Sequence, residues 1–282
     1  MRKFIILSAP VALVCAILGF FARRDWLRNA FEDVLSGTNR YISVPIRGAS
    51  QTTLLFALAA VLIVLTIAAA ALARSKPAQH TGYVTAFAPF GAVSLVASLL
   101  SAALFIAGAV QLALDALNTP AATTATHVSQ WVKAILALLT AAAVVGAALS
   151  ANTLAKSKKT RLSGTAAAGT LVPEVLLTLL LMSVFQARQS NPIILSYAPI
   201  ALAVALSAFA FYTEAAYAHD RPCPVRAVLT HMTAIFFCGV ALADNPDLRW
   251  ILGGSALILL VNLFKLTVNI ANTRVNKAVT AR

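Results

Sequence analysis

The chain has 282 residues, of which 60% are hydrophobic and only 11% are charged, and its formal net charge is +13. A soluble domain of this length carries about twice that charged fraction, so the composition excludes one and favours a single integral membrane domain over residues 1–282. The basic residues lie mainly in connectors and tails beside apolar segments, as topology signals do. We therefore expect anionic lipids at the cytoplasmic face as partners, and no nucleic acid.

Eight long apolar runs follow one another along the chain. Each approaches or exceeds the ~20 residues that an α-helix needs to cross the hydrocarbon of a bilayer. The sequence therefore predicts an all-α, polytopic transmembrane bundle of about eight spans. The runs cover residues 4–22, 53–73, 86–114, 131–154, 166–187, 193–217, 225–243 and 250–270.

The first run resembles a signal peptide, because it follows Arg2 and Lys3. It reaches Phe21 without a small-x-small cleavage pattern, and Arg23-Arg24 come soon afterwards. A further seven spans follow. We therefore expect an uncleaved first helix rather than a leader.

The segment 25–36 has a helical pattern of its own. Its apolar residues recur at helical spacing, and charged residues occupy the other face. Asp25 can cap the start, and Gly37 is a natural stop. The pattern predicts an interfacial helix on the outer surface with its apolar face toward the lipid. A plain continuation of the first span is the alternative.

The distribution of basic residues predicts the orientation. The tails and the connectors on their side of the membrane hold 13 Lys and Arg, against 8 in the remaining connectors. The positive-inside rule then favours both termini in the cytoplasm of a multi-pass protein of the cell membrane. Trp26, Trp131 and Trp250 all fall at the outer ends of spans in this arrangement, where indoles prefer to lie.

Glu174 is the candidate buried polar site in the fifth run. If that span begins near Thr165, Glu174 lies about 14 Å deep, where it needs a partner or a proton. Such a carboxyl group could relay protons or bind a cationic solute. The alternative is that the helix begins at Pro173, which favours the first turn, so that Glu174 is stabilised by the helix dipole.

His231 is the second candidate polar residue, about two turns into the seventh run. A histidine there is either functional or hydrogen-bonded to a neighbouring helix. The depth along each run places three further residues near the ends of spans, namely Asp115, Lys133 and Glu214. We interpret them as ordinary boundary residues. Lys265 is close enough to the cytoplasmic face to extend its amine toward water.

Motifs for catalysis, cofactors and metals are absent from the sequence. His80, His127, His219 and His231 share no ligand spacing, and the three cysteines form no CxxC pair. We therefore expect no enzyme, no cofactor and no metal site. The polar segment 212–221 is either a cytoplasmic gate or partner patch, or a solvated helix end.

Several short sequence features are scattered over most of the chain. They are Arg23-Arg24 followed by Phe31-Glu32, Pro173 in the fifth run, Asn191-Pro192 with Tyr197, and Ala243-Asp244 before the last run. In these features the chain resembles an uncharacterised family of bacterial eight-span integral membrane proteins. The resemblance implies a bacterial inner-membrane topology and a role for the external connectors that hold Glu32, Asn191 and Asp244. It implies no activity.

Two functions follow from this reading. The first is a permease-like solute or ion carrier with Glu174 as its buried site. The second is a non-catalytic membrane scaffold or accessory subunit of a larger complex, which would dock protein partners through its connectors and tails. A membrane-embedded enzyme is disfavoured because the sequence offers no paired catalytic groups.

Overall fold

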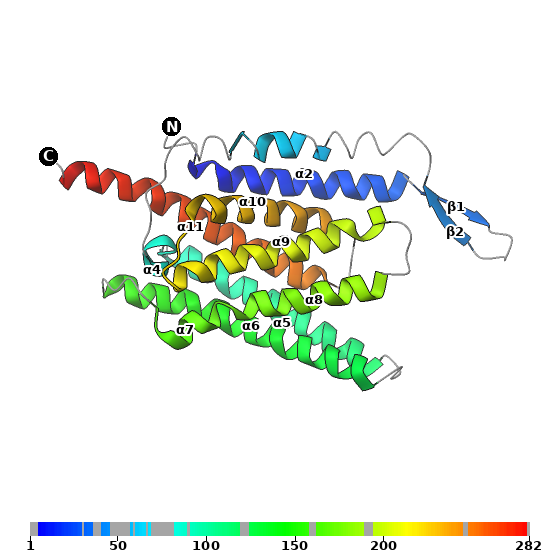
Figure 1. Ribbon diagram of the computed structural model, residues 1–282. Coiled ribbons are helices and arrows are strands. Elements are labelled where there is room, and N and C mark those ends of the chain that lie inside the picture. Colours follow the sequence, from blue (N-terminus) through cyan, green and yellow to red (C-terminus); the bar gives the residue numbers. More distant parts are fainter. Residues whose placement is uncertain are drawn as a thin grey trace.

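The computed structural model is a bundle of long helices with a small β-hairpin at one end (Figure 1). It describes residues 5–29, 31–35, 41–45, 57–58, 60–65, 67–68, 82–88, 91–118, 124–157, 162–188, 194–244 and 248–280. The helices and strands are α2 (Ser8–Asn29), β1 (Phe31–Leu35), β2 (Tyr41–Pro45), α4 (Tyr83–Ala86), α5 (Gly91–Asn118), α6 (Thr124–Lys156), α7 (Gly164–Gly169), α8 (Val172–Arg188), α9 (Ile194–Ala218), α10 (Pro224–Ala241) and α11 (Arg249–Thr280).

Six helical segments in the described residues are long and apolar enough to cross a membrane. They are Ala92–Asn118, Ser129–Lys156, Gly164–Gln186, Ala198–Ala218, Pro224–Ala241 and Arg249–Ala271. They correspond to the third to eighth predicted runs, so the chain is a multi-pass membrane protein.

The first two predicted spans are not among these six helical segments. The apolar part of α2 ends at Ala22, because Arg23, Arg24 and Asp25 occupy its last turns. Counted from Ser8, that part is shorter than the ~20 residues of a full span. Most of the run 53–73 lies outside the described residues. Its described parts are helical and lie beside α2, where Val61 and Val64 line a groove with Leu18 of that helix.

The interfacial helix predicted at 25–36 is not what the structure contains. Helix α2 continues to Asn29, which is the alternative of a prolonged first helix, and residues 31–35 form strand β1. β1 pairs antiparallel with β2, with Phe31 opposite Pro45 and Leu35 opposite Tyr41. The helical spacing of apolar residues failed as a guide because a short apolar segment also fits a strand, and tertiary pairing decides between them.

The outward faces of the bundle are apolar, as expected of helices in lipid. Along α5, small polar residues at helical spacing are buried, namely Ser94, Ser98 and Ser101. The opposite face of the same helix exposes large apolar side chains, which are Val93, Val96, Leu99, Leu100, Ile106, Val110, Leu114 and Leu117. This is the reverse of a water-soluble helix, and it suits a helix whose outer face meets lipid.

Helices α9, α10 and α11 form the inner part of the bundle. Helix α10 packs against α2, α9 and α11, and 72% of its span is buried, against 28% for the span that combines α7 and α8. Close approach of helices explains part of this burial. Gly239 of α10 meets the backbone of Ala16 in α2, and Gly254 of α11 accepts a hydrogen bond of 2.8 Å from Ser101 of α5.

The bundle has two distinguishable ends (Figure 1). The hairpin end holds β1 and β2, together with the end of α2 and the starts of α6 and α11. The α4 end holds α4, the start of α2 and the end of α11. The helices that carry the three tryptophans thus bring them toward the hairpin end, while the described ends of the chain lie together at the α4 end.

Candidate functional site

A tight turn places α10 beside α9. The turn ends α9 with two reverse hydrogen bonds: the Arg221 amide donates to the Ala216 carbonyl at 2.8 Å, and the Asp220 amide donates to the Tyr217 carbonyl at 3.4 Å. Asp220 between them has φ 58, the left-handed conformation that this type of helix ending requires. Pro224 then opens α10 at a position where a missing amide hydrogen costs nothing. Consequently the last turns of α9 face the first turns of α10.

The turn brings Glu214 and His231 into direct contact. The distance from His231 Nε2 to Glu214 Oε1 is 2.7 Å, and the two residues are 0% and 5% exposed. One residue earlier on each helix, the hydroxyls of Thr213 and Thr230 are hydrogen-bonded at 3.1 Å. Two successive polar contacts therefore join α9 and α10 inside the bundle.

The hydrogen bonds define how protons are distributed on this pair. His231 Nδ1 lies 2.6 Å from the Ala227 carbonyl oxygen, which can only accept, so Nδ1 carries a hydrogen. Nε2 then has two possibilities: it donates to an ionised Glu214, or it accepts from a protonated Glu214. Both forms satisfy every bond, and they differ only in which side of a 2.7 Å contact holds one proton. The geometry of the contact therefore accommodates either position of the proton.

Helix α11 completes the surroundings of the Glu214 carboxyl group. Asn262 Nδ2 donates to Oε1 at 3.0 Å and to Oε2 at 3.1 Å. The Lys265 amine donates to Asn262 Oδ1 at 3.4 Å, and both α11 residues are buried. Asn262 thus bridges Lys265 and Glu214. These four residues (Glu214, His231, Asn262 and Lys265) are called the Glu214 cluster below.

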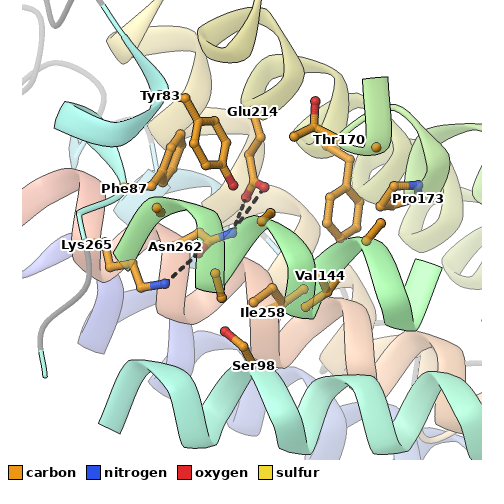
Figure 2. A pocket seen from close by; sticks show the side chains of 16 residues that line it. Tyr83, Phe87, Ser98, Val144, Thr170, Pro173, Glu214, Ile258, Asn262 and Lys265 are labelled. Carbon is orange, nitrogen blue, oxygen red and sulfur yellow. Dashed lines mark hydrogen bonds between the residues drawn. The ribbon is translucent and has the colours of Figure 1, made fainter. Parts of the chain in front are cut away.

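A small cavity opens on one side of the Glu214 cluster (Figure 2). Its volume is about 30 Å³, enough for one or two water molecules. Glu214, Asn262 and Lys265 line it together with Thr170 and Pro173, which flank the interruption between α7 and α8. The junction of α7 and α8 therefore forms part of the cavity wall.

Helix α4 covers the cavity at its own end of the bundle. The hydroxyl of Tyr83 points toward Glu214 and Asn262 (Figure 2). Burial, with a further contribution from the Glu214 carboxylate, raises the pKa of Tyr83, so its hydroxyl remains a donor. The Tyr83 ring packs on Phe87 at a centroid distance of 4.8 Å, and Asn269 of α11 donates to the Ala86 carbonyl at 2.9 Å.

The two sequence candidates are not brought together. His231 bonds Glu214, whereas Glu174 is half-buried in the first turn of α8 and has no hydrogen bond or ion pair within the described part of the chain. α8 begins at Val172, immediately before Pro173, whereas the candidate span that contains Glu174 begins at Gly164. The neighbouring Pro173 lines the cavity, but Glu174 is not among its lining residues.

Sequence reasoning missed Glu214 and Lys265 as members of a site. Glu214 is only four residues from the end of α9, about 6 Å along the axis, so the boundary estimate of its depth was sound. It is nevertheless buried, because α4 and the neighbouring helices cover it. The polar segment 212–221 is divided accordingly: Tyr212 is exposed, while Glu214 and Tyr217 are buried.

A buried ion pair lies at the hairpin end. Arg23 Nε, in the last part of α2, donates to Asp244 Oδ1 at 2.6 Å in the turn between α10 and α11. The two side chains are 1% and 3% exposed. Buried polar contacts therefore exist near both ends of α10, one to α9 and one to α2.

Comparisons with known proteins identify no family for the chain. Neither a protein-family model, nor a curated protein, nor a solved structure matches the chain. Within the described residues, no group of three or more His, Cys, Asp or Glu side chains could hold a metal ion. The Glu214 cluster is therefore the feature of the molecule from which we infer a function.

Proposed function

We propose that this chain is a permease-like carrier of a bacterial inner membrane that moves protons through the Glu214–His231 pair. The observation that carries the proposal is the 2.7 Å contact between a buried carboxyl group and a buried imidazole, within helices that can span a membrane. Ionisable side chains at such positions are costly, and proton relays are one of the functions that retain them. On this proposal the protein is a carrier and not an enzyme.

The partners of Glu214 suit a group that gains and loses a proton. In the ionised form, Asn262 and His231 donate to the carboxylate oxygens and offset the loss of water. In the protonated form, Glu214 can donate to His231 Nε2 without any movement of the helices. Both forms use the same contact, so transfer of the proton between the two side chains needs no rearrangement of the hydrogen bond.

The cavity provides the route by which water reaches the pair. It connects Glu214 to Thr170 and Pro173 at the interruption between α7 and α8, and Tyr83 closes it on the α4 side. A movement of α4 or of the α7–α8 segment would open this space. In this proposal Glu174 is a helix-start residue and is not the proton-binding group.

Proton flux in proteoliposomes tests the proposed function. Vesicles that contain an internal pH-sensitive dye receive a valinomycin-mediated potassium potential, and the initial rate of acidification is measured. We expect flux for the natural sequence, loss to the rate of protein-free vesicles for Glu214→Gln, and unchanged flux for the matched control Glu174→Gln. Flux that is equal in all three, or absent from all three, would overturn the proposal.

A further inference from the structure

An apolar groove lies between α2, α5 and α11, on the outer surface of the bundle. Its volume is about 540 Å³, and its walls include Leu13 of α2, Val93 of α5, and Leu260 and Phe264 of α11. Val93 is 79% exposed and Phe264 is 44% exposed. Since these faces meet hydrocarbon in a membrane, the groove is suited to an acyl chain.

Two polar side chains interrupt the apolar lining. Ser94 is 5% exposed, and its hydroxyl has no hydrogen-bond partner among the described residues. Lys265 is 4% exposed and lines both this groove and the cavity of the Glu214 cluster. Its bond to Asn262 is long at 3.4 Å, and a lysine amine has three hydrogens to donate. The Ser94 hydroxyl and the Lys265 amine can therefore each donate a further hydrogen bond.

Ser94 lies close to the start of the candidate span of α5, which begins at Ala92. Ser94 is three residues after Gly91, the first residue of α5, which is about 4.5 Å along the axis. Ala9, on the opposite wall, is the second residue of α2. Leu13 and Leu260 continue the groove deeper into the bundle. The first turn of α5 also has the positive end of the helix dipole, which favours an anion there.

We propose that this groove binds one anionic phospholipid. The phosphate accepts hydrogen bonds from Ser94 Oγ and Lys265 Nζ, and one acyl chain follows Leu13 and Leu260 toward the middle of the bundle. The chemistry is complementary, because the Lys265 amine lines the groove and the phosphate is negative. This site goes beyond the proposed carrier function, and its occupancy can be measured without any flux.

Native mass spectrometry of the full chain in mild detergent tests the site. Phosphatidylglycerol is titrated against the natural sequence, Lys265→Gln, Ser94→Ala and the matched control Lys156→Gln. Lys156 is an exposed cation at the end of α6, away from the groove. For Lys265→Gln we expect about tenfold weaker binding, because one charge-assisted hydrogen bond is lost. Ser94→Ala should also bind more weakly, and Lys156→Gln should bind like the natural sequence.

Three results would overturn this proposal. The first is equal binding of phosphatidylcholine and phosphatidylglycerol by the natural sequence. The second is displacement of phosphatidylglycerol by an equal concentration of soluble glycerol phosphate, which would make the site one for free phosphate. The third is equal binding by Ser94→Ala, Lys265→Gln and the natural sequence. Ser94→Ala, a small change in the first turn of α5, keeps the test decisive if Lys265→Gln fails to fold.

Discussion

Glu214 and His231 are 17 residues apart in the chain, yet Oε1 and Nε2 lie 2.7 Å apart inside the bundle. The contact exists because Asp220 adopts a left-handed backbone conformation that turns α10 back along α9. The turn therefore creates the polar centre of the molecule, and α11 adds Asn262 and Lys265 to it.

Removal of one member of the pair destabilises the fold. His231→Leu removes the nitrogen that Glu214 Oε1 contacts at 2.7 Å, and we expect a loss of about 1–3 kcal/mol, the usual cost of leaving a buried polar group without its partner. The double variant Glu214→Gln/His231→Leu, which removes the charge as well, recovers part of this loss. Thermal unfolding in detergent compares the two variants. Equal stability of the single variant and the natural sequence would contradict the buried contact.

Breaking the Arg23–Asp244 ion pair at the hairpin end should also destabilise the fold. Arg23→Gln removes one partner of a pair that is at most 3% exposed, so a loss of about 3–5 kcal/mol is expected. Arg24→Gln is the matched control, because Arg24 is the next residue and is exposed. Thermal unfolding of Arg23→Gln, Asp244→Asn and the double variant gives the coupling energy of the pair. Strictly additive effects would mean that Arg23 and Asp244 do not interact.

Much of this architecture could be predicted from the sequence, because long apolar runs are a local signal. Runs three to eight became the six spans, and Pro173 correctly marked the start of a helix. The Glu214 cluster could not be predicted in the same way. Depth along one helix places Glu214 near an end, but its burial depends on α4, which lies in a connector without a strong pattern.

The failures have different physical origins. The segment 25–36 was predicted as a helix, since its apolar residues have a helical spacing, but the backbone of residues 31–35 pairs with residues 41–45 instead. Arg23 and Asp244 are 221 residues apart, and nothing in the local pattern of either one indicates the other. Glu174, predicted from its depth along the span, stays a prediction; the adjacent Pro173 lines the cavity.

Two glycines test the close packing of the helices. An added Cβ at Gly239 would lie 2.5 Å from the carbonyl oxygen of Ala16, so Gly239→Ala forces α2 away from α10. We expect a loss of about 1–3 kcal/mol, as for other overpacked sites. Gly146→Ala is the matched control: nothing lies within 4 Å of the new Cβ, and the helix gains up to about 1 kcal/mol in propensity. Thermal unfolding distinguishes them, and loss of stability in both variants would contradict the assigned packing.

Cysteine labelling tests the proposed orientation. Cys223 is exposed in the turn between α9 and α10, whereas Cys15 and Cys238 are buried. If both termini are cytoplasmic, this turn is cytoplasmic too, so a membrane-impermeant maleimide should label the protein only after spheroplasts are permeabilised. The variant Cys223→Ser should remain unlabelled in both conditions. Labelling of intact spheroplasts that disappears in Cys223→Ser would require the opposite orientation.

Infrared difference spectroscopy gives the most direct test of the central claim, that Glu214 takes up the transported proton. Spectra of the purified protein in lipid are compared between alkaline and acidic buffer, for the natural sequence, Glu214→Gln and Glu174→Gln. We predict a band of a protonated carboxyl group on acidification that persists in Glu174→Gln and disappears in Glu214→Gln. A band that survives in Glu214→Gln with unchanged intensity would contradict the account.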